Sequence, residues 1–246
     1  MYNRKGEWEM NIKKMKEKAL KKLTGNYKVI VPALIIYGLM MAFFHCVSGL
    51  IYDESMDILF YVLIVGLFYM GLVQITFKIS KGEKTNIKML FSRTDLFWKT
   101  IAIAIVNTLF TLICAILECI AAKSLMTFIL NEADINIMLV TLMIIIGVLL
   151  CSAIAIFYVV IMVSWSQVYF ILYENNEMPV SDIYSESMDL MEENKIDYIL
   201  LHLSFIGWAI AGLFTFGLLY LWLTPYVAVT ETNFYHELKK KEKKQS

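Results

Sequence analysis

The sequence has few charged residues. Only 18% of its 246 residues are Asp, Glu, Lys or Arg, whereas 59% are hydrophobic, and its mean hydropathy is +0.63. A soluble globular domain carries about 25% charged residues, so this composition excludes that class. It predicts an integral membrane protein.

Motifs of enzyme active sites and metal centres are also missing. The chain contains no GxSxG, HExxH, P-loop, GxGxxG or EF-hand pattern, and no histidines or carboxylates at metal-ligand spacing. Its cysteines lie inside apolar runs without CxxC spacing, and we interpret them as small buried hydrophobic residues: Cys46, Cys114, Cys119 and Cys151. We therefore expect no enzymatic activity, no metal, no cofactor and no nucleic-acid partner. A cleavable signal is not expected either, because a long charged segment precedes the first apolar run.

Four apolar runs are long enough to cross a membrane, which takes about 20 residues. They cover residues 27–51, 58–77, 100–122 and 136–162. The fourth run stays apolar and aromatic as far as Tyr173. A helix of that length would extend beyond the bilayer, so we predict that it projects from the inner face or kinks near Trp165.

The positions of Lys and Arg predict which side of the membrane each connection occupies. Nine basic residues lie in residues 1–28, before or at the very start of the first span, and none lies in the connection 52–57. Six lie between residues 78 and 99, whereas 123–136 contains only Lys123. Because cytoplasmic connections carry the excess of Lys and Arg, the N-terminus is predicted to lie in the cytoplasm.

The last apolar region, residues 196–235, is nearly long enough for two crossings. One crossing would place the lysine-rich tail outside, against the charge bias, whereas two keep it inside. Thr215, Phe216 and Gly217 offer a turn with a permissive glycine. We therefore predict spans at 196–214 and 218–236, and a multi-pass protein of the cell membrane with both termini in the cytoplasm.

Each predicted hairpin follows a segment with apolar residues at helical spacing. These segments are 10–24, 85–97 and 180–194, and they predict helices at the inner interface. The predicted fold is all-α: a polytopic membrane helix bundle of six transmembrane helices in three hairpins, each preceded by a cytoplasmic interfacial amphipathic helix. This pattern suggests three copies of one unit, an interfacial helix followed by a membrane hairpin. The alternative is that these segments are ordinary amphipathic loops and that no unit is repeated.

We predict one integral membrane domain over residues 1–246. Its parts are a basic amphipathic helix (1–26), a first hairpin (27–77), an interfacial helix (78–99), a second hairpin (100–173), an acidic amphipathic helix (174–195), a third hairpin (196–236) and a basic tail (237–246).

Charge is segregated between two of the predicted cytoplasmic segments. Residues 1–28 have nine basic and three acidic side chains, whereas 174–198 has one lysine against eight acidic residues. The basic segment suits a lipid bilayer with an anionic inner leaflet. The acidic segment would dock on the basic helix or on a partner protein, or remain solvated. Self-association through the cytoplasmic helices is a further alternative.

Polar residues at membrane depth are costly and are candidates for function. Gln74 and Glu118 lie near predicted span ends, where Lys123 could satisfy Glu118. Asn107 lies deeper and suits a hydrogen bond between helices, with pore lining as the alternative. His45 lies near the outer end of its span, which favours a hydrated side chain.

His202 and Glu231 lie almost equally far from the predicted turn at Phe216. On antiparallel helices, equal distances place both side chains at the same depth, so we predict that they touch. Small residues on one face, Ser204, Gly207 and Ala211, would ease the packing of this hairpin. The pair either only satisfies its own polarity or acts as a proton-linked switch.

The stretches GNY, ESMDLMEENK, LSFIGW, LWLTPY and NFYHEL carry a family resemblance. With them the chain resembles the bacterial integral membrane proteins catalogued as domain of unknown function 975. The matching residues are Gly25, Asn26, Tyr27, Ser187, Met188, Leu190, Met191, Asn194, Lys195, Leu203, Ser204, Phe205, Ile206, Gly207, Trp208, Pro225, Tyr226, Phe234 and Tyr235. The resemblance implies a multi-spanning topology and no particular reaction.

Two classes of function fit these observations. The first is a non-enzymatic scaffold, regulator or immunity-type component of an envelope or transport complex, which needs no catalytic motif. The second is a small-solute transporter or channel, for which Pro32 and Pro225 are the hints of broken helices. A polar cavity through the bundle would favour transport, and a dry interior would favour the scaffold. An intramembrane enzyme is a third class without a motif in its favour.

Overall fold

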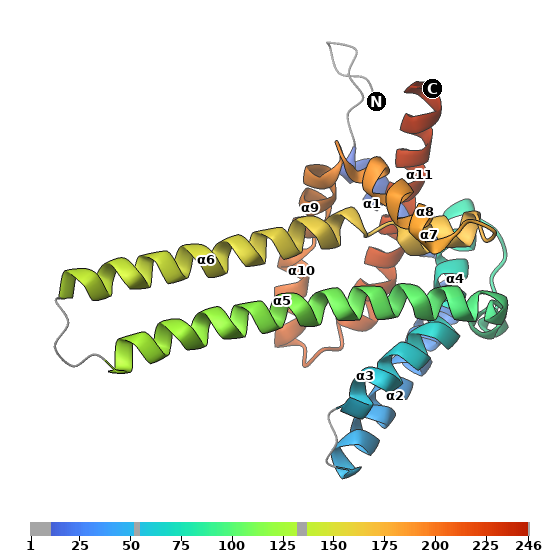
Figure 1. Ribbon diagram of the computed structural model, residues 1–246. Helices are drawn as coiled ribbons and strands as arrows, with labels where there is room; N and C mark the ends of the chain where they lie inside the picture. Colours follow the sequence, from blue (N-terminus) through green and yellow to red (C-terminus); the bar gives the residue numbers. More distant parts are fainter. Residues whose placement is uncertain (1–10, 52–54, 132–136, 246) are drawn as a thin grey trace. The chain divides into compact units, whose positions relative to one another are not determined.

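The computed structural model describes residues 11–51, 55–131 and 137–245, and in these ranges it contains helices and turns but no strand (Figure 1). This confirms the all-α prediction for the described part of the chain. Among the described residues, five helical stretches are long and apolar enough to cross a membrane: 27–50, 56–81, 87–128, 140–174 and 195–214. They are compatible with a multi-pass membrane protein.

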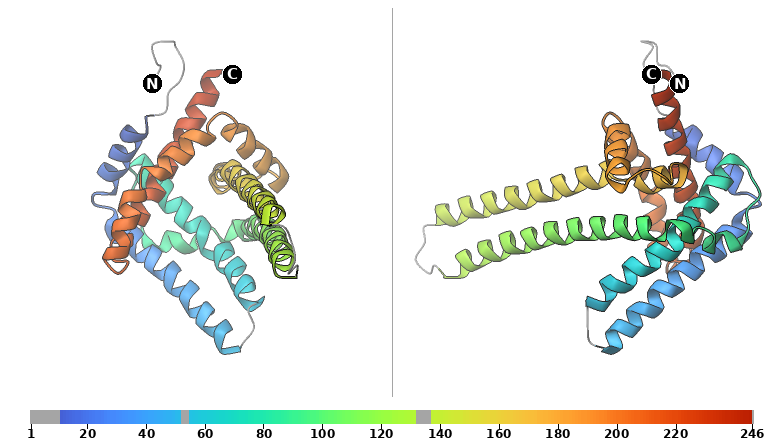
Figure 2. Two further views of the ribbon diagram at one scale, coloured as in Figure 1. Left: turned by 90° about the vertical axis from the view of Figure 1, so that its left-hand side faces the viewer. Right: turned by 45° about the vertical axis from the view of Figure 1, so that its right-hand side comes forward.

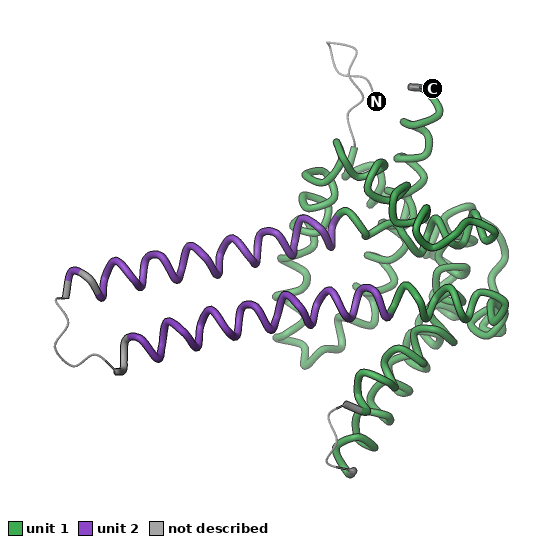
Figure 3. The backbone as a smooth tube through the Cα atoms, in the orientation of Figure 1, with its two compact units in different colours: residues 1–104, 164–246 green, residues 105–163 purple. Residues whose placement is uncertain are grey.

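The chain divides into two compact units (Figure 3). Unit 1 consists of residues 1–104 and 164–246, and unit 2 consists of residues 105–163. Each unit is described by itself below.

The first half of unit 1 contains a short helix and a pair of long ones. These are α1 (Ile12–Leu23), α2 (Tyr27–Ile51), α3 (Ser55–Ile64), the π-helix η1 (Val65–Tyr69) and α4 (Met70–Lys81). The side chain of Asn11 caps α1 by accepting from the Lys14 amide at 2.8 Å. Gly25 then turns the chain into α2 with a φ of +96°, which a glycine adopts without steric cost. The α2 and α3 helices lie side by side as a hairpin in both views of Figure 2.

The predicted interfacial helix over 85–97 is not an α-helix. The segment forms two 3-10 helices, η2 (Ile87–Phe91) and η3 (Thr94–Leu96). Residues three apart share a face in a 3-10 helix as well, so the apolar spacing did not separate the two. The tight turn brings the backbone of Leu90 against Gly71, where a Cβ would lie 2.2 Å from the Leu90 carbonyl oxygen.

The second half of unit 1 contains α7 (Val168–Glu174), α8 (Val180–Met191), α9 (Lys195–Leu203), α10 (Ile206–Phe214) and α11 (Tyr220–Gln245). The predicted kink near Trp165 is present, because α6 ends at Ser164 and α7 begins at Val168. The predicted turn at 215–217 is also present, with positive φ at Phe216 and Gly217. The predicted helix over 180–194 is confirmed by α8, and the one over 10–24 by α1 within the described residues.

The predicted helix over 196–214 is broken at Ser204 and Phe205. At the break, the ammonium group of Lys16 donates to the Ser204 carbonyl oxygen at 2.9 Å and to the Ser204 hydroxyl at 3.0 Å. Lys16 also lies 4.0 Å from the centre of the Phe205 ring. A side chain that satisfies a freed carbonyl is a common cause of a helix break.

The core of unit 1 is aromatic. Tyr235 is fully buried, and its ring lies 5.4 Å from that of Phe170 and 5.7 Å from that of Phe77. Its hydroxyl donates to Glu174 at 2.8 Å. Phe234 beside it is fully buried as well, so these two residues of the family motif hold the centre of unit 1.

Unit 2 is an antiparallel pair of helices formed by most of α5 (Phe97–Asn131) and α6 (Ile137–Ser164). The α5 helix extends well beyond residue 122, where the predicted span ended. Gly147 packs against Leu125, and the rings of Phe110 and Tyr158 stack 6.0 Å apart. Most other side chains are apolar and exposed, as expected for helices surrounded by lipid.

Candidate functional site

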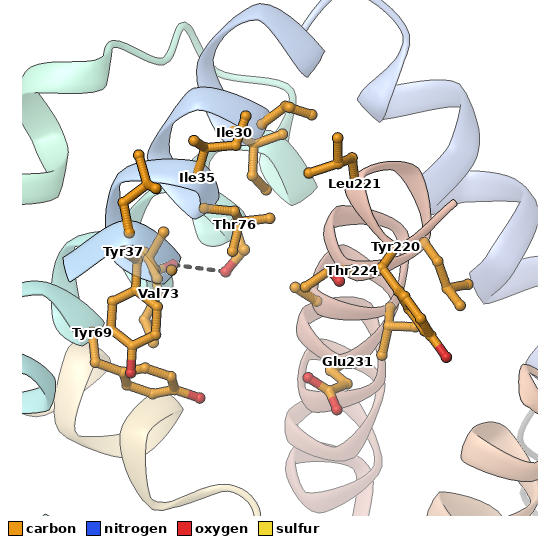
Figure 4. A pocket seen from close by; sticks show the side chains of 18 of the residues that line it. Ile30, Ile35, Tyr37, Tyr69, Val73, Thr76, Tyr220, Leu221, Thr224 and Glu231 are labelled. Atoms are coloured by element: carbon orange, nitrogen blue, oxygen red, sulfur yellow. Dashed lines mark hydrogen bonds between the residues drawn. The ribbon is translucent and has the colours of Figure 1, made fainter. Parts of the chain in front are cut away.

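Unit 1 contains a cavity of about 770 Å³ between α2, α4 and α11 (Figure 4). Its walls are mostly aliphatic and aromatic. The lining residues are Ile30, Val31, Leu34, Ile35, Tyr37, Gly38, Leu39, Tyr69, Leu72, Val73, Thr76, Phe170, Tyr220, Leu221, Leu223, Thr224, Val227, Ala228 and Glu231. Glu231 is the only Asp, Glu, Lys, Arg or His among these lining residues.

Small residues on α2 and α11 leave the space of the cavity open. Gly38 on α2 has no atom of another element within 4 Å of the position where its Cβ would lie, and Ala228 contributes only a methyl group from α11. The hydroxyl of Thr76 donates to the Val73 carbonyl oxygen of its own helix at 2.9 Å, a bond that Figure 4 draws. Its hydrogen bond is thereby made within α4, and the wall stays apolar.

Glu231 projects from α11, and Tyr37 and Tyr69 lie on the wall across from it (Figure 4). One carboxylate oxygen of Glu231 lies 3.1 Å from Nε2 of His202. The side chains of His202 and Glu231 are 41% and 25% exposed, respectively. The predicted contact between His202 and Glu231 is therefore present.

Tyr198 is a third member of this group that the sequence reasoning missed. Its hydroxyl donates to the same Glu231 oxygen at 3.4 Å, and its ring lies 4.5 Å from the His202 ring. Tyr198 precedes His202 by four residues on α9, so both side chains lie on one helix face. That spacing was the signal that could have found it.

The arrangement is suited to binding an amphiphile. A cavity of a few hundred cubic ångströms with apolar walls and a few polar groups is typical of small-molecule sites. A carboxylate at one end favours a cation or a hydrogen-bond donor, and His202 and Tyr198 hold that carboxylate from the other side.

The other polar candidates lie apart from this cavity. His45 is 78% exposed, and its Nδ1 lies 3.1 Å from Asp57, which also accepts from the Ser48 hydroxyl. Gln74 accepts from the Ser92 hydroxyl at 2.5 Å, so it joins α4 to the 3-10 segment.

Asn107 and Glu118 lie on α5 in unit 2. The Asn107 carbonyl oxygen accepts from the Thr111 hydroxyl at 2.8 Å. Glu118 is half-buried and lies well before the end of α5. The expected partner Lys123 is exposed, and no ion pair joins these two described residues. They are five positions apart in the sequence, and side chains at that spacing do not share a helix face.

The acidic helix α8 docks on the basic end of α11. Lys239 is ion-paired with Glu186, and Lys241 lies 3.0 Å from Glu193. Lys241 also donates to the amide oxygen of Asn194 at 3.1 Å. One expected outcome was that the acidic segment docks on the N-terminal basic helix. Instead, α11 packs against both α1 and α8, and its lysines pair with the carboxylates of the acidic segment.

Other residues of the family motif stabilise turns and helix contacts. Asn26 donates to the Lys22 carbonyl oxygen at 2.8 Å and accepts from Thr85 at 3.1 Å. Ser187 donates to the Ser164 carbonyl oxygen at 2.7 Å, which fastens α8 to the end of α6. Met191 is fully buried, and the rings of Phe205 and Tyr226 meet edge to face at 5.1 Å.

The described cysteines are all free, and only Cys114 is buried as predicted, whereas Cys46 and Cys119 are exposed. In the described part of the chain, no group of three or more His, Cys, Asp or Glu side chains has the arrangement of a metal site.

Comparison with known families gives one match. The family described as "Protein of unknown function (DUF975)" matches residues 3–242, nearly the whole chain. No curated protein and no solved structure matches the chain.

Proposed function

Because the chain belongs to the DUF975 family, whose description assigns no activity, we propose its function from the cavity: it is a non-enzymatic membrane protein that binds a lipophilic ligand beside Glu231. Through the helices packed on α11, the bound ligand regulates an envelope or transport complex. The observation that carries this proposal is the cavity of about 770 Å³ with a single carboxylate on its wall. An apolar interior of this kind agrees better with a binding or scaffolding role than with a channel.

The ligand that fits is an amphiphile with an apolar body and a cationic or hydrogen-bond-donating head. Aliphatic side chains of α2 and α4 would contact the body by apolar burial. The head would meet Glu231, whose charge is expensive at membrane depth unless a partner compensates it. A purely apolar molecule would leave the carboxylate with only His202 and Tyr198.

The α11 helix connects this cavity to the ion-paired end of unit 1. Glu231 lies on the cavity wall, and Glu237, Lys239 and Lys241 follow within three turns of the same helix. They pair with α1, with α8 and with Glu193 just after α8. A ligand that shifts or straightens α11 would therefore change the surface that α1 and α8 present to a partner protein.

The topology that we propose has six crossings with both termini in the cytoplasm. Its support is the contact between α1 and the end of α11, where Asn233 donates to the Met15 carbonyl oxygen at 3.2 Å and Lys18 lies 3.5 Å from Glu237. The α1 helix precedes the first candidate span, and its contact with the end of α11 supports an even number of crossings between them. The five apolar stretches give an odd number, and α11 supplies the sixth crossing.

The test is photolabelling of the purified protein in lipid nanodiscs with a long-chain alkylamine that carries a diazirine. We expect labelled peptides from α2 and α11. Gly38→Leu should abolish this labelling, because its side chain extends into open space within the cavity. Gly49→Leu is the matched control, since Gly49 is on the same helix, is equally uncrowded and does not line the cavity.

The Glu231→Gln variant tests the contribution of the ligand's head to binding separately from that of its apolar body. It should weaken labelling by the amine but not by the alkyl alcohol of the same chain length, because only the amine is attracted by the charge. Equal labelling of the parent protein and of Gly38→Leu would contradict ligand binding in this cavity.

A transporter of small amphiphiles is the second candidate. It is favoured by irregular helices around Glu231: the break at Ser204 and Phe205 follows His202, and the π-helix η1 supplies Tyr69 to the cavity wall. Broken helices and π-bulges are frequent at transport and functional sites. Uptake of the alkylamine into proteoliposomes that depends on Gly38 and Glu231 would establish transport in place of regulation.

A further inference from the structure

Unit 1 contains a second cavity of about 930 Å³ that shares no lining residue with the first. It lies between the end of α1, the end of α4 and the last turns of α11. Seven lysines and three glutamates line it. Its walls thus carry an excess of positive charge, although the whole chain is formally neutral.

The carboxylates leave several of these lysines unpaired. Glu237 lies 2.9 Å from Lys240 and 3.5 Å from Lys18, while Lys239 is paired with Glu186 and Glu242. In the described part of the chain, no carboxylate lies within ion-pair distance of Lys21, Lys81 or Lys243. These three lysines come from α1, α4 and α11, one from each helix.

The pKa of Lys22 reflects the repulsion among these lysines. Its ammonium group donates to the Ser80 carbonyl oxygen, which joins α1 to α4. Burial lowers the pKa of Lys22, and the positive charges of Lys18 and Lys240 lower it further. An anion in the cavity would relieve this repulsion.

Neutral groups suited to an anion lie among the lysines. The Ser80 hydroxyl donates to the Phe77 carbonyl oxygen at 3.0 Å and lies 2.8 Å from Nε2 of His236, and Asn175 and Asn233 also line the wall. Lysine ammonium groups bind phosphate as compact point charges, and side-chain amides can donate further hydrogen bonds to it. This lining of charged and polar side chains does not suit a purely lipophilic ligand.

We propose that this basic cavity binds a phosphate-bearing anion, which Lys21, Lys81 and Lys243 contact together and which ties α1, α4 and α11 to one another. Two sources share that chemistry: the headgroup of an anionic phospholipid and a soluble phosphate compound. The candidate span 56–81 ends at Lys81, so a lipid headgroup lies within reach of the site. This inference does not depend on the apolar cavity.

The experiment measures the thermal unfolding midpoint of the purified protein in phosphatidylcholine nanodiscs. One arm adds inorganic pyrophosphate, with potassium chloride of equal ionic strength as its control. The other arm replaces part of the phosphatidylcholine with phosphatidylglycerol. We expect the midpoint to rise in at least one arm: a rise with pyrophosphate alone identifies a soluble ligand, and a rise with phosphatidylglycerol alone identifies a headgroup.

The variants assign that rise to the cavity. The double variant Lys21→Gln, Lys81→Gln should weaken binding by about tenfold or more, because two charge-assisted contacts are lost. Lys21→Arg, Lys81→Arg keeps both charges and should retain binding. Lys13→Gln is the matched control, because Lys13 is an exposed lysine of α1 outside the cavity.

Two results would overturn the proposal. One is a midpoint that rises in neither arm. The other is a rise that the Lys13→Gln variant loses as fully as the double variant does, which would indicate general attraction to a basic surface. The midpoints without anion show whether each variant is folded.

Discussion

Glu231 is the residue on which the candidate site depends. It is the charged residue on the wall of the apolar cavity, and His202 and Tyr198 both contact the same carboxylate oxygen. A carboxylate at membrane depth needs such partners, because an isolated charge there costs several kcal/mol. The contacts therefore hold the carboxylate at the end of the cavity.

The contact between His202 and Glu231 predicts coupling in a double-mutant cycle. We expect Glu231→Gln and His202→Gln to be non-additive by about 0.5–3 kcal/mol of unfolding free energy, the range for residues in direct contact. The measurement is reversible unfolding of the protein in mixed micelles. Tyr198→Phe removes one hydroxyl only and should be the mildest of the three single changes, whereas additive effects of the first two would reduce the pair to mere proximity.

This part of the site could be predicted from the sequence only where local geometry decided it. The turn at 215–217 fixes which residues of the last hairpin lie at equal depth, and so His202 and Glu231 were paired correctly. The cavity could not be predicted, because α2, α4 and α11 come from distant parts of the chain and the empty space depends on how Gly38 and Ala228 face their neighbours.

At the scale of the element, α11 is the helix that the proposed six-crossing topology requires as its last crossing. It is not among the five apolar stretches, although it lies at the centre of unit 1 and packs against α1, α2, α4, α8 and α10. Its polar residues Thr230, Thr232 and Asn233 are buried. The two threonine hydroxyls donate to carbonyl oxygens of the same helix, so polar residues that would lower the score on a lipid-facing helix are satisfied inside.

The bounds of α2 were predicted, whereas α5 extends beyond its predicted end at residue 122 and several helix irregularities were not predicted. The start and end of α2 match the predicted span, since about 20 apolar residues are a direct signal. The π-helix η1, the break at Ser204 and the 3-10 segment over 87–96 were not foreseen. Each depends on a tertiary contact, such as the one between Lys16 and Ser204, that apolar spacing does not encode.

The glycines of α4 and α10 give opposite predictions. Gly71→Ala should destabilise the protein by about 1–3 kcal/mol, because its Cβ would collide with the backbone of Leu90, which cannot rotate away. Gly207→Ala should change stability by no more than about 1 kcal/mol, the helix-propensity difference. We had expected Gly207 to ease helix packing, but nothing lies within 4 Å of its Cβ position.

Thermal unfolding of both variants in the same detergent tests this contrast, and each variant serves as the control for the other. Tolerance of Gly71→Ala would mean that η2 does not pack on α4 as described. A large loss at Gly207 would point to a helix contact outside the described chain.

At the scale of the whole molecule, the oppositely charged segments of the chain pair with one another within unit 1. Carboxylates of α8 and of the residues just after it pair with Lys239 and Lys241 of α11, while lysines of α1, α4 and α11 contribute the positive charge of the second cavity. The sequence indicated the two opposite charges but not their partners, because residues 237–246 were predicted only as a basic tail that follows the last span. Its continuation as an ordered helix brings it between α1 and α8.

Both proposed sites require that α11 crosses the membrane and brings its basic end back to the side of α1. The most direct test is a C-terminal fusion after Ser246 to a reporter that is active on only one side of the membrane, expressed in intact cells beside the same reporter fused before Met1. We predict that both reporters are cytoplasmic. A cytoplasmic N-terminal reporter with an extracytoplasmic C-terminal one would contradict the six-span topology, the packing of α11 on α1 and the role proposed for Glu231.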